Sequence, residues 1–175
     1  MAGEFDLGEF EQWIYTNQEL ELRLDAEHYL AIISLDYLKP SSLYEAEKIL
    51  RQYIDLARHY EWYISGILQH IIERSPHVQI YIEQCYQLYC DGFTFLRNLA
   101  FNYGLKIKVV PASYSAENWY KLTSAKKVQL IDSFYPDVAK EAQKILDGLR
   151  DRQIVIIDVD ESNKSVDYLD NRIDR

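Results

Sequence analysis

The most regular hydrophobic pattern in the chain lies between residues 43 and 71. Apolar and aromatic side chains recur there at alternating spacings of three and four residues: Leu43, Ala46, Leu50, Tyr53, Ala57, Tyr60, Ile64, Ile67 and Ile71. Such spacings place all of them on one face of an α-helix. The pattern predicts either one helix of ~30 residues, ~45 Å long, or two helices that separate near Asp55. Tyrosine and alanine along the stripe favour a helical bundle within one chain over a coiled coil.

Three shorter helices are predicted before this stripe from their start signals. Asp6 or Gly8 begins the first, and a capping box at Thr16–Glu19 begins the second. Asp25 caps a third, whose Ile-Ile-Ser-Leu centre also suits a strand. A second capping box, Ser42–Glu45, begins the long stripe itself.

A further long helix is predicted between Ser75 and Gly104. Serine suits the cap, and Pro76 suits the first helical position, where no amide donor is needed. Its apolar stripe consists of Val78, Ile82, Cys85, Tyr89, Phe93, Leu96 and Ala100. Because glycine readily adopts the left-handed conformation that ends helices, Gly104 is the expected stop.

Beyond residue 104 the hydrophobic period changes. Residues 105–110 alternate apolar and basic side chains, as a half-buried strand does. Two helices follow, one from Thr123 or Ser124 and one from Pro136, and residues 153–160 and 165–169 predict a β-hairpin with a four-residue loop. The predicted fold is mainly α: a multi-helix bundle with a small C-terminal antiparallel β-hairpin, and with room for a third strand at 105–110.

Length and composition fit one soluble globular domain. Of 175 residues, 48% are hydrophobic and 27% charged, which argues against disorder. We expect a single domain over residues 1–175, in which a helical part, 1–104, and a mixed part, 105–175, are not independent. Apolar runs are too short to cross a membrane, and the acidic N-terminus does not resemble a secretory signal. With two cysteines only, the sequence predicts a cytoplasmic protein.

Acidic residues are concentrated near the N-terminus. The net charge is −9, and residues 1–50 carry 11 acidic against 3 basic residues, whereas residues 101–150 carry 5 against 8. No strong cluster of lysine and arginine exists, so nucleic acid is not an expected partner. The acidic third would attract a basic protein partner. A solvated helix surface, or a complement to the basic segment of the same chain, would have the same composition.

Cys85 and Cys90 lie in one predicted helix. A separation of five residues corresponds to ~500° of rotation about the helix axis and to a distance of ~8.6 Å between the two Cα atoms. This distance is too long for a disulfide. We therefore expect neither a disulfide nor a metal pair, unless a break at Asp91–Gly92 turns Cys90 outward as a lone thiol. The four histidines also lack the spacing of four that helical zinc sites use.

The segment QIVIIDVDES resembles the first motif of haloacid dehalogenase phosphatases. That resemblance implies Asp158 as nucleophile and Asp160 as general acid, with magnesium alongside. Only 15 residues follow Asp160, however, and that motif opens a doubly wound α/β domain. A simpler interpretation pairs these aspartates with Lys106 or Lys108 on a neighbouring strand. We expect no catalytic residue, no metal site and no cofactor; a metal-dependent hydrolase using Asp158 and Asp160 is the alternative.

Aromatic side chains supply the candidate contact residues. Tyr114, Trp119 and Tyr120 lie in a polar connection where helix packing does not require rings, and exposed tyrosine and tryptophan are favoured in protein interfaces. The segment could instead fold Trp119 into the core, where Trp13 and Trp62 are also expected. A regulatory protein with an aromatic-lined pocket for a small ligand is a further alternative.

Two stretches resemble known bacterial sequences. FEQWIYTNQELELRL, with the later YLAIISLDY, is similar to the opening of small immunity proteins encoded beside polymorphic toxins. LYCDGFTFLRNLAFNYGL and SFYPDVAKEAQKIL resemble a block found in uncharacterised bacterial proteins. The first resemblance covers under a fifth of the chain. It implies a non-enzymatic intracellular protein that binds and blocks a toxin domain.

Overall fold

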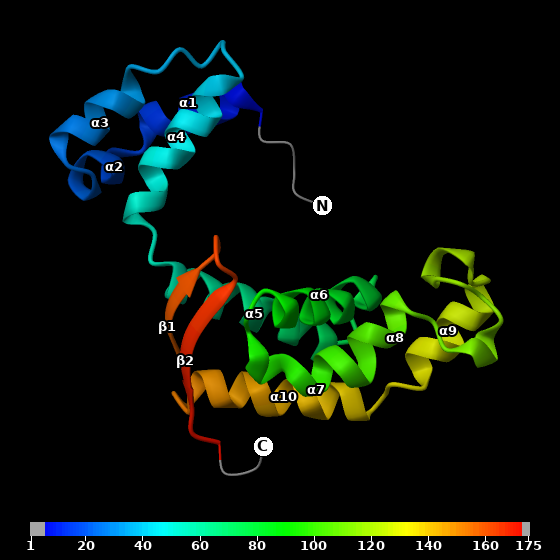
Figure 1. The fold of residues 1–175 in the computed structure, drawn as a ribbon. Coiled ribbons are helices and arrows are strands. Elements are labelled where there is room, and N and C mark those ends of the chain that lie inside the picture. The colour runs from blue at the N-terminus through cyan, green and yellow to red at the C-terminus, as the bar shows by residue number, and fades with distance from the viewer. Residues whose placement is uncertain (1–5, 173–175) are drawn as a thin grey trace. The chain divides into compact units, whose positions relative to one another are not determined.

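The computed structural model describes residues 6–172, which are mainly α-helical (Figure 1). Two strands, β1 (Ile154–Asp160) and β2 (Ser165–Asp170), form an antiparallel hairpin near the C-terminus, so the predicted fold class is confirmed. Contacts between Cα atoms divide the chain into two compact units, which we call unit 1 (residues 1–55) and unit 2 (residues 56–175). Each unit has its own hydrophobic core. Within residues 6–172 no helix combines the length and apolarity that crossing a membrane requires.

Unit 1 is an assembly of short helices. They are α1 (Leu7–Thr16), α2 (Gln18–Arg23), α3 (Ala26–Ile33), α4 (Ser41–Leu50) and the 3-10 helix η1 (Arg51–Tyr53). Asp6 caps α1 and Asp25 caps α3, both as predicted. The buried core of the unit consists of Ile14, Leu20, Leu24, Ile32, Tyr37 and Ala46.

The two predicted capping boxes are wrong. Thr16 ends α1, where its hydroxyl donates to a carbonyl oxygen four residues earlier, and Asn17 caps α2 by accepting from the Glu19 amide (3.1 Å). Ser42 is buried within the first turn of α4, and its hydroxyl donates to the Asp36 carbonyl oxygen (2.5 Å). In both cases the hydroxyl bonds a preceding carbonyl, a local alternative that serine and threonine always offer.

The long hydrophobic stripe belongs to two helices, so the second of the two alternatives is correct. After α4 and η1, Ile54 is extended before α5 (Leu56–Ile72) begins. Ala46 is buried in the core of unit 1, whereas Ile64 and Ile67 are buried in the core of unit 2. One continuous sequence pattern therefore serves two separate cores.

Unit 2 packs α5 against α6 (Val78–Cys90), α10 (Asp137–Arg150) and β1. Shorter elements complete the unit: η2 (Thr94–Leu96), α7 (Arg97–Leu99), η3 (Ala100–Gly104), α8 (Leu105–Lys108), η4 (Ala112–Tyr114), η5 (Trp119–Lys121) and α9 (Ser124–Asp132). The mixed part beyond residue 104 thus shares its core with the helices before it. A single domain spanning both units stays a prediction.

Helix α6 ends at a left-handed glycine. Gly92 has φ 108°, and the Phe93 amide bonds the Leu88 carbonyl (3.0 Å), which is the long bond of a Schellman motif. A Cβ atom on Gly92 would lie 2.7 Å from the carbonyl oxygen of Lys164 in the hairpin loop. The predicted helix to residue 104 is therefore interrupted at Asp91–Gly92.

The predicted strand at 105–110 is wrong, because helix continues through this region. η3 is a turn of π-helix that joins α7 to α8. The alternating pattern is accommodated on a helix: Ile107 is buried, while Lys106 and Lys108 lie over the rings of Phe134 and Tyr86 (6.0 and 5.5 Å to the centroids). The alternation of exposed lysines with a buried isoleucine therefore fits this short helix as well as it would fit a strand.

Two predicted helix boundaries are also wrong. Gly104 has a helical φ of −58°, and a Cβ there would lie 2.8 Å from the carbonyl oxygen of Ile82. Glycine is needed at this position for close helix packing and not for a stop. At the start of α6 the cap position is His77, with φ 63°, while the Ser75 hydroxyl bonds Nδ1 of His70 (3.0 Å).

Trp13 and Trp62, both expected in the core, are exposed. Trp13 is 45% and Trp62 73% exposed, whereas Ile14 and Ile64 nearby are fully buried. A displacement of one or two residues along a helix turns a side chain by about 100–200°. Each tryptophan therefore faces away from the core that its neighbour occupies.

The hairpin agrees with the sequence prediction. Residues 161–164 form the four-residue loop, and Asp160 lies opposite Ser165. The register shifts between Ile156 and Asp158, which marks a β-bulge at the intervening residue.

Candidate functional site

The three aromatic residues predicted to contact a partner lie in the connection between α8 and α9. Tyr114 ends η4, and Trp119 and Tyr120 lie in η5. Tyr114 and Trp119 are half-buried against the core of unit 2, whereas Tyr120 is 85% exposed. Of the three, Tyr120 presents most of its ring to solvent, and the contact role of the group stays a prediction.

Lysines at the start of α9 hold this connection in place. Lys126 Nζ donates to the Tyr114 carbonyl oxygen (2.6 Å). Lys127 Nζ lies 5.6 Å from the centroid of the Trp119 ring. Together with the burial of the two rings, these contacts favour the alternative in which Trp119 folds back onto the core.

The Asp160 carboxylate caps the hairpin loop. It accepts hydrogen bonds from the Ser162 hydroxyl (2.5 Å), from the Asn163 side-chain amide (2.7 Å) and from both backbone amides (3.0 and 3.1 Å). These bonds, with the Ser162 hydroxyl first, lower the pKa of Asp160 to about 2. The carboxylate thus stabilises the turn through four hydrogen bonds from the loop.

Asp158 lies on an exposed part of β1, opposite Asp167 on β2. Its predicted pairing with Lys106 or Lys108 is wrong, because both lysines belong to α8. In the stretch from residue 6 to residue 172, no group of three or more His, Cys, Asp or Glu side chains is placed to hold a metal ion. The two hairpin aspartates are therefore not joined by a third ligand from this part of the chain.

Cys85 and Cys90 are both free thiols, in agreement with the helical geometry. Burial raises the pKa of Cys85 to about 12, as expected for a thiol used as a small apolar side chain. Cys90 is exposed at the end of α6, next to Tyr86, and its negative charge when ionised raises the pKa of that tyrosine. The break after Cys90 leaves one thiol at the surface.

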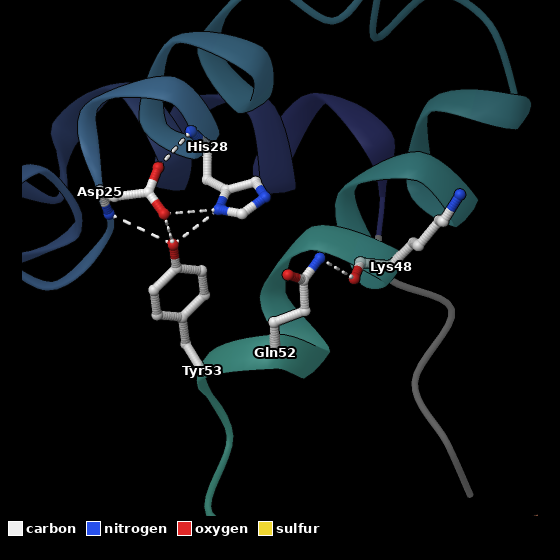
Figure 2. A network of polar contacts seen from close by, with 5 residues as sticks. All are labelled: Asp25, His28, Lys48, Gln52 and Tyr53. Carbon is white, nitrogen blue, oxygen red and sulfur yellow. Dashed lines mark hydrogen bonds and ion pairs between the residues drawn. The ribbon is translucent and has the colours of Figure 1, made fainter.

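A hydrogen-bond network in unit 1 joins the start of α3 to the end of η1 (Figure 2). The Asp25 carboxylate accepts from the His28 backbone amide (2.8 Å) and from the Tyr53 hydroxyl (2.5 Å). Nδ1 of His28 lies 2.8 Å from that carboxylate and 2.7 Å from the Tyr53 oxygen. The Asp25 amide also donates to the Tyr53 oxygen (3.2 Å). Three side chains thereby tie the C-terminal end of unit 1 to its third helix.

The network shifts two pKa values in opposite directions. Hydrogen bonds from the His28 amide and the Tyr53 hydroxyl lower the pKa of Asp25 to about 2, and the bond to Asp25 raises the pKa of Tyr53. An ionised Asp25 favours the histidine tautomer that carries its proton on Nδ1. Nε2 of His28 points away from the carboxylate (Figure 2). In the same view the Gln52 amide donates to the Lys48 carbonyl oxygen (3.3 Å).

Unit 2 contains an open cleft of about 810 Å³. It is lined by Tyr89, Thr94, Phe95, Arg97, Asn98, Phe101, Asn102, Tyr168, Asp170 and Arg172. These residues come from the end of α6, from the helical segment 94–102, and from β2 with the residues after it. The cleft was not predictable from the sequence, because its walls are about 70 residues apart along the chain. The sequence does contain one signal for the cleft, which is the grouping of polar and aromatic residues on one helical face at positions 97, 98, 101 and 102.

No known protein family matches the chain, and neither a curated protein nor a solved structure was found to resemble it. Functional conclusions therefore depend on the residues and their geometry.

Proposed function

We propose that this protein is a cytoplasmic protein-binding module whose acidic N-terminal unit docks on a basic surface of a partner. The observation that carries the proposal is the distribution of charge between the two units. Residues 1–55 contain 12 acidic and 4 basic residues, a net charge of −8, whereas residues 56–175 contain 16 and 15, a net charge of −1. Unit 1 thus accounts for −8 of the net charge of −9.

Much of this acidic charge is not neutralised within unit 1. Glu19, Asp36 and Glu47 form ion pairs with neighbouring lysine or arginine side chains. Glu21 and Glu27 are exposed and have no ion pair among residues 6–172. Such charges raise the rate at which a basic partner associates and disfavour acidic competitors.

Exposed apolar side chains accompany these acids. Leu22 on α2, Leu30 on α3 and Tyr44 on α4 are all more than half exposed, and the acids Glu21, Glu27 and Glu45 lie on the same three helices. Protein interfaces combine an apolar centre with a polar rim. Unit 1 exposes both apolar and acidic side chains from which such an interface can be built.

The N-terminal resemblance to immunity proteins of polymorphic toxins supports a specific role. On this proposal the protein is not an enzyme; it neutralises a toxin domain by covering a basic surface of that domain. Tyr120 of unit 2 is the residue of the aromatic connection most accessible to the same partner.

The test is co-expression with the product of the adjacent gene, followed by size-exclusion chromatography and titration calorimetry. We expect a stable complex whose affinity falls as salt is raised. The triple variant E21K/E27K/E45K, at exposed positions of unit 1, is expected to weaken it at least about tenfold. The matched control, E83K/D151K/D167K, changes the net charge equally on unit 2 and is expected to retain the affinity.

Two results would contradict this proposal. One is the absence of any complex, together with catalytic turnover by the isolated protein. The other is an equal loss of affinity in both triple variants, because net charge and not unit 1 would then determine binding.

A further inference from the structure

The cleft of unit 2 has the size and chemistry of a small-molecule site, and it is independent of the acidic unit. Its volume of about 810 Å³ lies within the range of roughly 300–1,000 Å³ that ligand sites occupy. Every lining residue belongs to unit 2. A ligand in this cleft would therefore bind independently of a protein partner of unit 1.

Among residues 6–172, the lining of the cleft includes one ion pair and one arginine that forms no ion pair. Arg172 donates to both oxygens of Asp170, from Nε (2.9 Å) and from Nη2 (2.8 Å), and both side chains are largely buried. This planar, bidentate pair forms a neutral part of the wall. Arg97 is exposed and forms no ion pair with any residue between 6 and 172. Within that described range its guanidinium group is a positive charge of the cleft without a paired carboxylate.

Hydrogen bonds and aromatic contacts hold the other walls. The Asn98 side-chain amide donates to Glu141 (3.0 Å), which orients its carbonyl oxygen, and the hydroxyls of Thr94 and Tyr168 bond each other (2.7 Å). Tyr89 and Phe101 meet edge to face, 4.9 Å between ring centroids. The surroundings of Arg97 are thus both ordered and aromatic.

The backbone beneath Phe101 is a turn of π-helix. In η3 the Leu105 amide bonds the Ala100 carbonyl five residues earlier. Such turns interrupt the ordinary helical bonding and occur frequently at functional sites. Here the turn carries Phe101 and Asn102 into the lining of the cleft, one helical turn after Arg97 and Asn98.

We propose that this cleft binds a small organic anion that carries a planar ring. The carboxylate or phosphate of the ligand pairs with the Arg97 guanidinium, and Asn102, which also lines the cleft, is a second polar contact for the anion. The ring of the ligand lies against Phe101, which is 41% exposed. Guanidinium groups bind carboxylates and phosphates bidentately, and aromatic rings pack on one another in offset or edge-to-face arrangements.

The full-length protein is titrated with three probes, and its amide spectrum is recorded by NMR. The probes are 3-phenylpropanoate, its neutral analogue 3-phenylpropanamide, and phenyl phosphate. We expect shifts at Arg97, Asn98 and Phe101, and an affinity for at least one anion that exceeds that for the amide by about tenfold or more. The stronger of the two anions identifies the acid group that the site prefers.

Two variants test the role of the arginine. Arg97→Gln is expected to remove the preference for anion over amide, while Arg150→Gln, an exposed position outside the cleft, is expected to keep it. Unchanged spectra away from the cleft verify that both variants are folded. The proposal is overturned if neither anion shifts these residues, if the amide binds as well as the anions, or if Arg97→Gln leaves the preference intact.

Discussion

At the scale of single residues, two glycines of unit 2 provide a matched pair. Gly92 has φ 108°, and a Cβ there would come within 2.7 Å of the Lys164 carbonyl oxygen. Gly66 lies within α5, and a Cβ there would meet no atom within 4 Å. The same substitution therefore has opposite consequences at the two positions.

We expect Gly92→Ala to lower the free energy of unfolding by about 1–3 kcal/mol, because both the left-handed backbone and the contact with the loop become strained. Gly66→Ala should raise it by about 0.5–1 kcal/mol, because alanine restricts the unfolded chain and favours helix. Urea unfolding monitored by circular dichroism measures both. Changes of the same sign in the two variants would contradict this assignment.

Asp25 predicts a pH dependence for unit 1. Its folded pKa is about 2, below the ordinary value of 3.8. The ionised carboxylate therefore stabilises the folded state fully above pH 3.8, and this contribution is lost as the pH falls from 3.8 towards 2.

Titration of side-chain carboxyl carbons by NMR tests the cause of that shift. Tyr53→Phe removes one donor to Asp25, so the pKa of Asp25 should rise towards 3.8. Asp160, whose pKa of about 2 depends on bonds in the hairpin loop, should not respond. A rise at both aspartates, or at neither, would show that the Tyr53 hydroxyl is not responsible.

At the scale of elements, the hairpin contains an unfavourable pair. Asp158 and Asp167 lie directly opposite each other on β1 and β2. Like charges in this position destabilise a sheet. We expect Asp167→Lys to raise the free energy of unfolding by about 0.2–1 kcal/mol, less at high salt because exposed charges are screened.

Asp167→Asn is the control for this prediction, since it removes the repulsion and adds no attraction. In chemical denaturation, Asp167→Asn should raise the free energy of unfolding by less than Asp167→Lys does. If Asp167→Lys is neutral or destabilising at low salt, the pair does not interact across the strands.

At the scale of the whole molecule, the two cores differ in size. Among residues 6–172, six buried side chains form the core of unit 1 and twenty-six form that of unit 2. Less buried apolar area supplies less stabilisation. The amides of α3 should therefore exchange with solvent at a lower opening free energy than those of α5 and α10.

Ile32→Ala, in the core of unit 1, tests this by hydrogen exchange. The loss of a buried isoleucine typically costs about 2–5 kcal/mol, and we expect faster exchange in unit 1 with little change in unit 2. Ile64→Ala is the matched change in unit 2. If Ile32→Ala accelerates the slowest amides of both units equally, the chain unfolds as one cooperative domain, as the sequence predicts.

Local signals in the sequence were sufficient for much of the fold. Asp25 caps a helix as predicted, and of the predicted alternatives Asp6 and Thr123 are the caps. The hairpin has its predicted loop, because caps and turns depend on residues within a few positions of one another. Helical geometry alone was enough to separate Cys85 from Cys90. The concentration of acidic charge near the N-terminus is likewise a property of composition.

Other features depended on contacts between distant residues. Residues 105–108 alternate like a strand, yet they continue the helical turn of η3, and Ile107 is buried in the core of unit 2. Gly104 reads as a helix stop, but it serves close packing against Ile82. The cleft around Arg97 and the network of Asp25, His28 and Tyr53 each join segments that the sequence leaves far apart.

The sequence by itself therefore determined the helical class, the C-terminal hairpin, the isolated thiols and the acidic N-terminal end, since periodicity, turn chemistry and charge act locally. Only the tertiary structure decided that one hydrophobic stripe serves two cores, that Asp91–Gly92 ends α6, and which side chains meet in the cleft. The physical reason is that burial and hydrogen bonding depend on which surfaces of the chain meet. A hydrophobic pattern marks a face that will be buried, but it does not specify the segment against which that face packs.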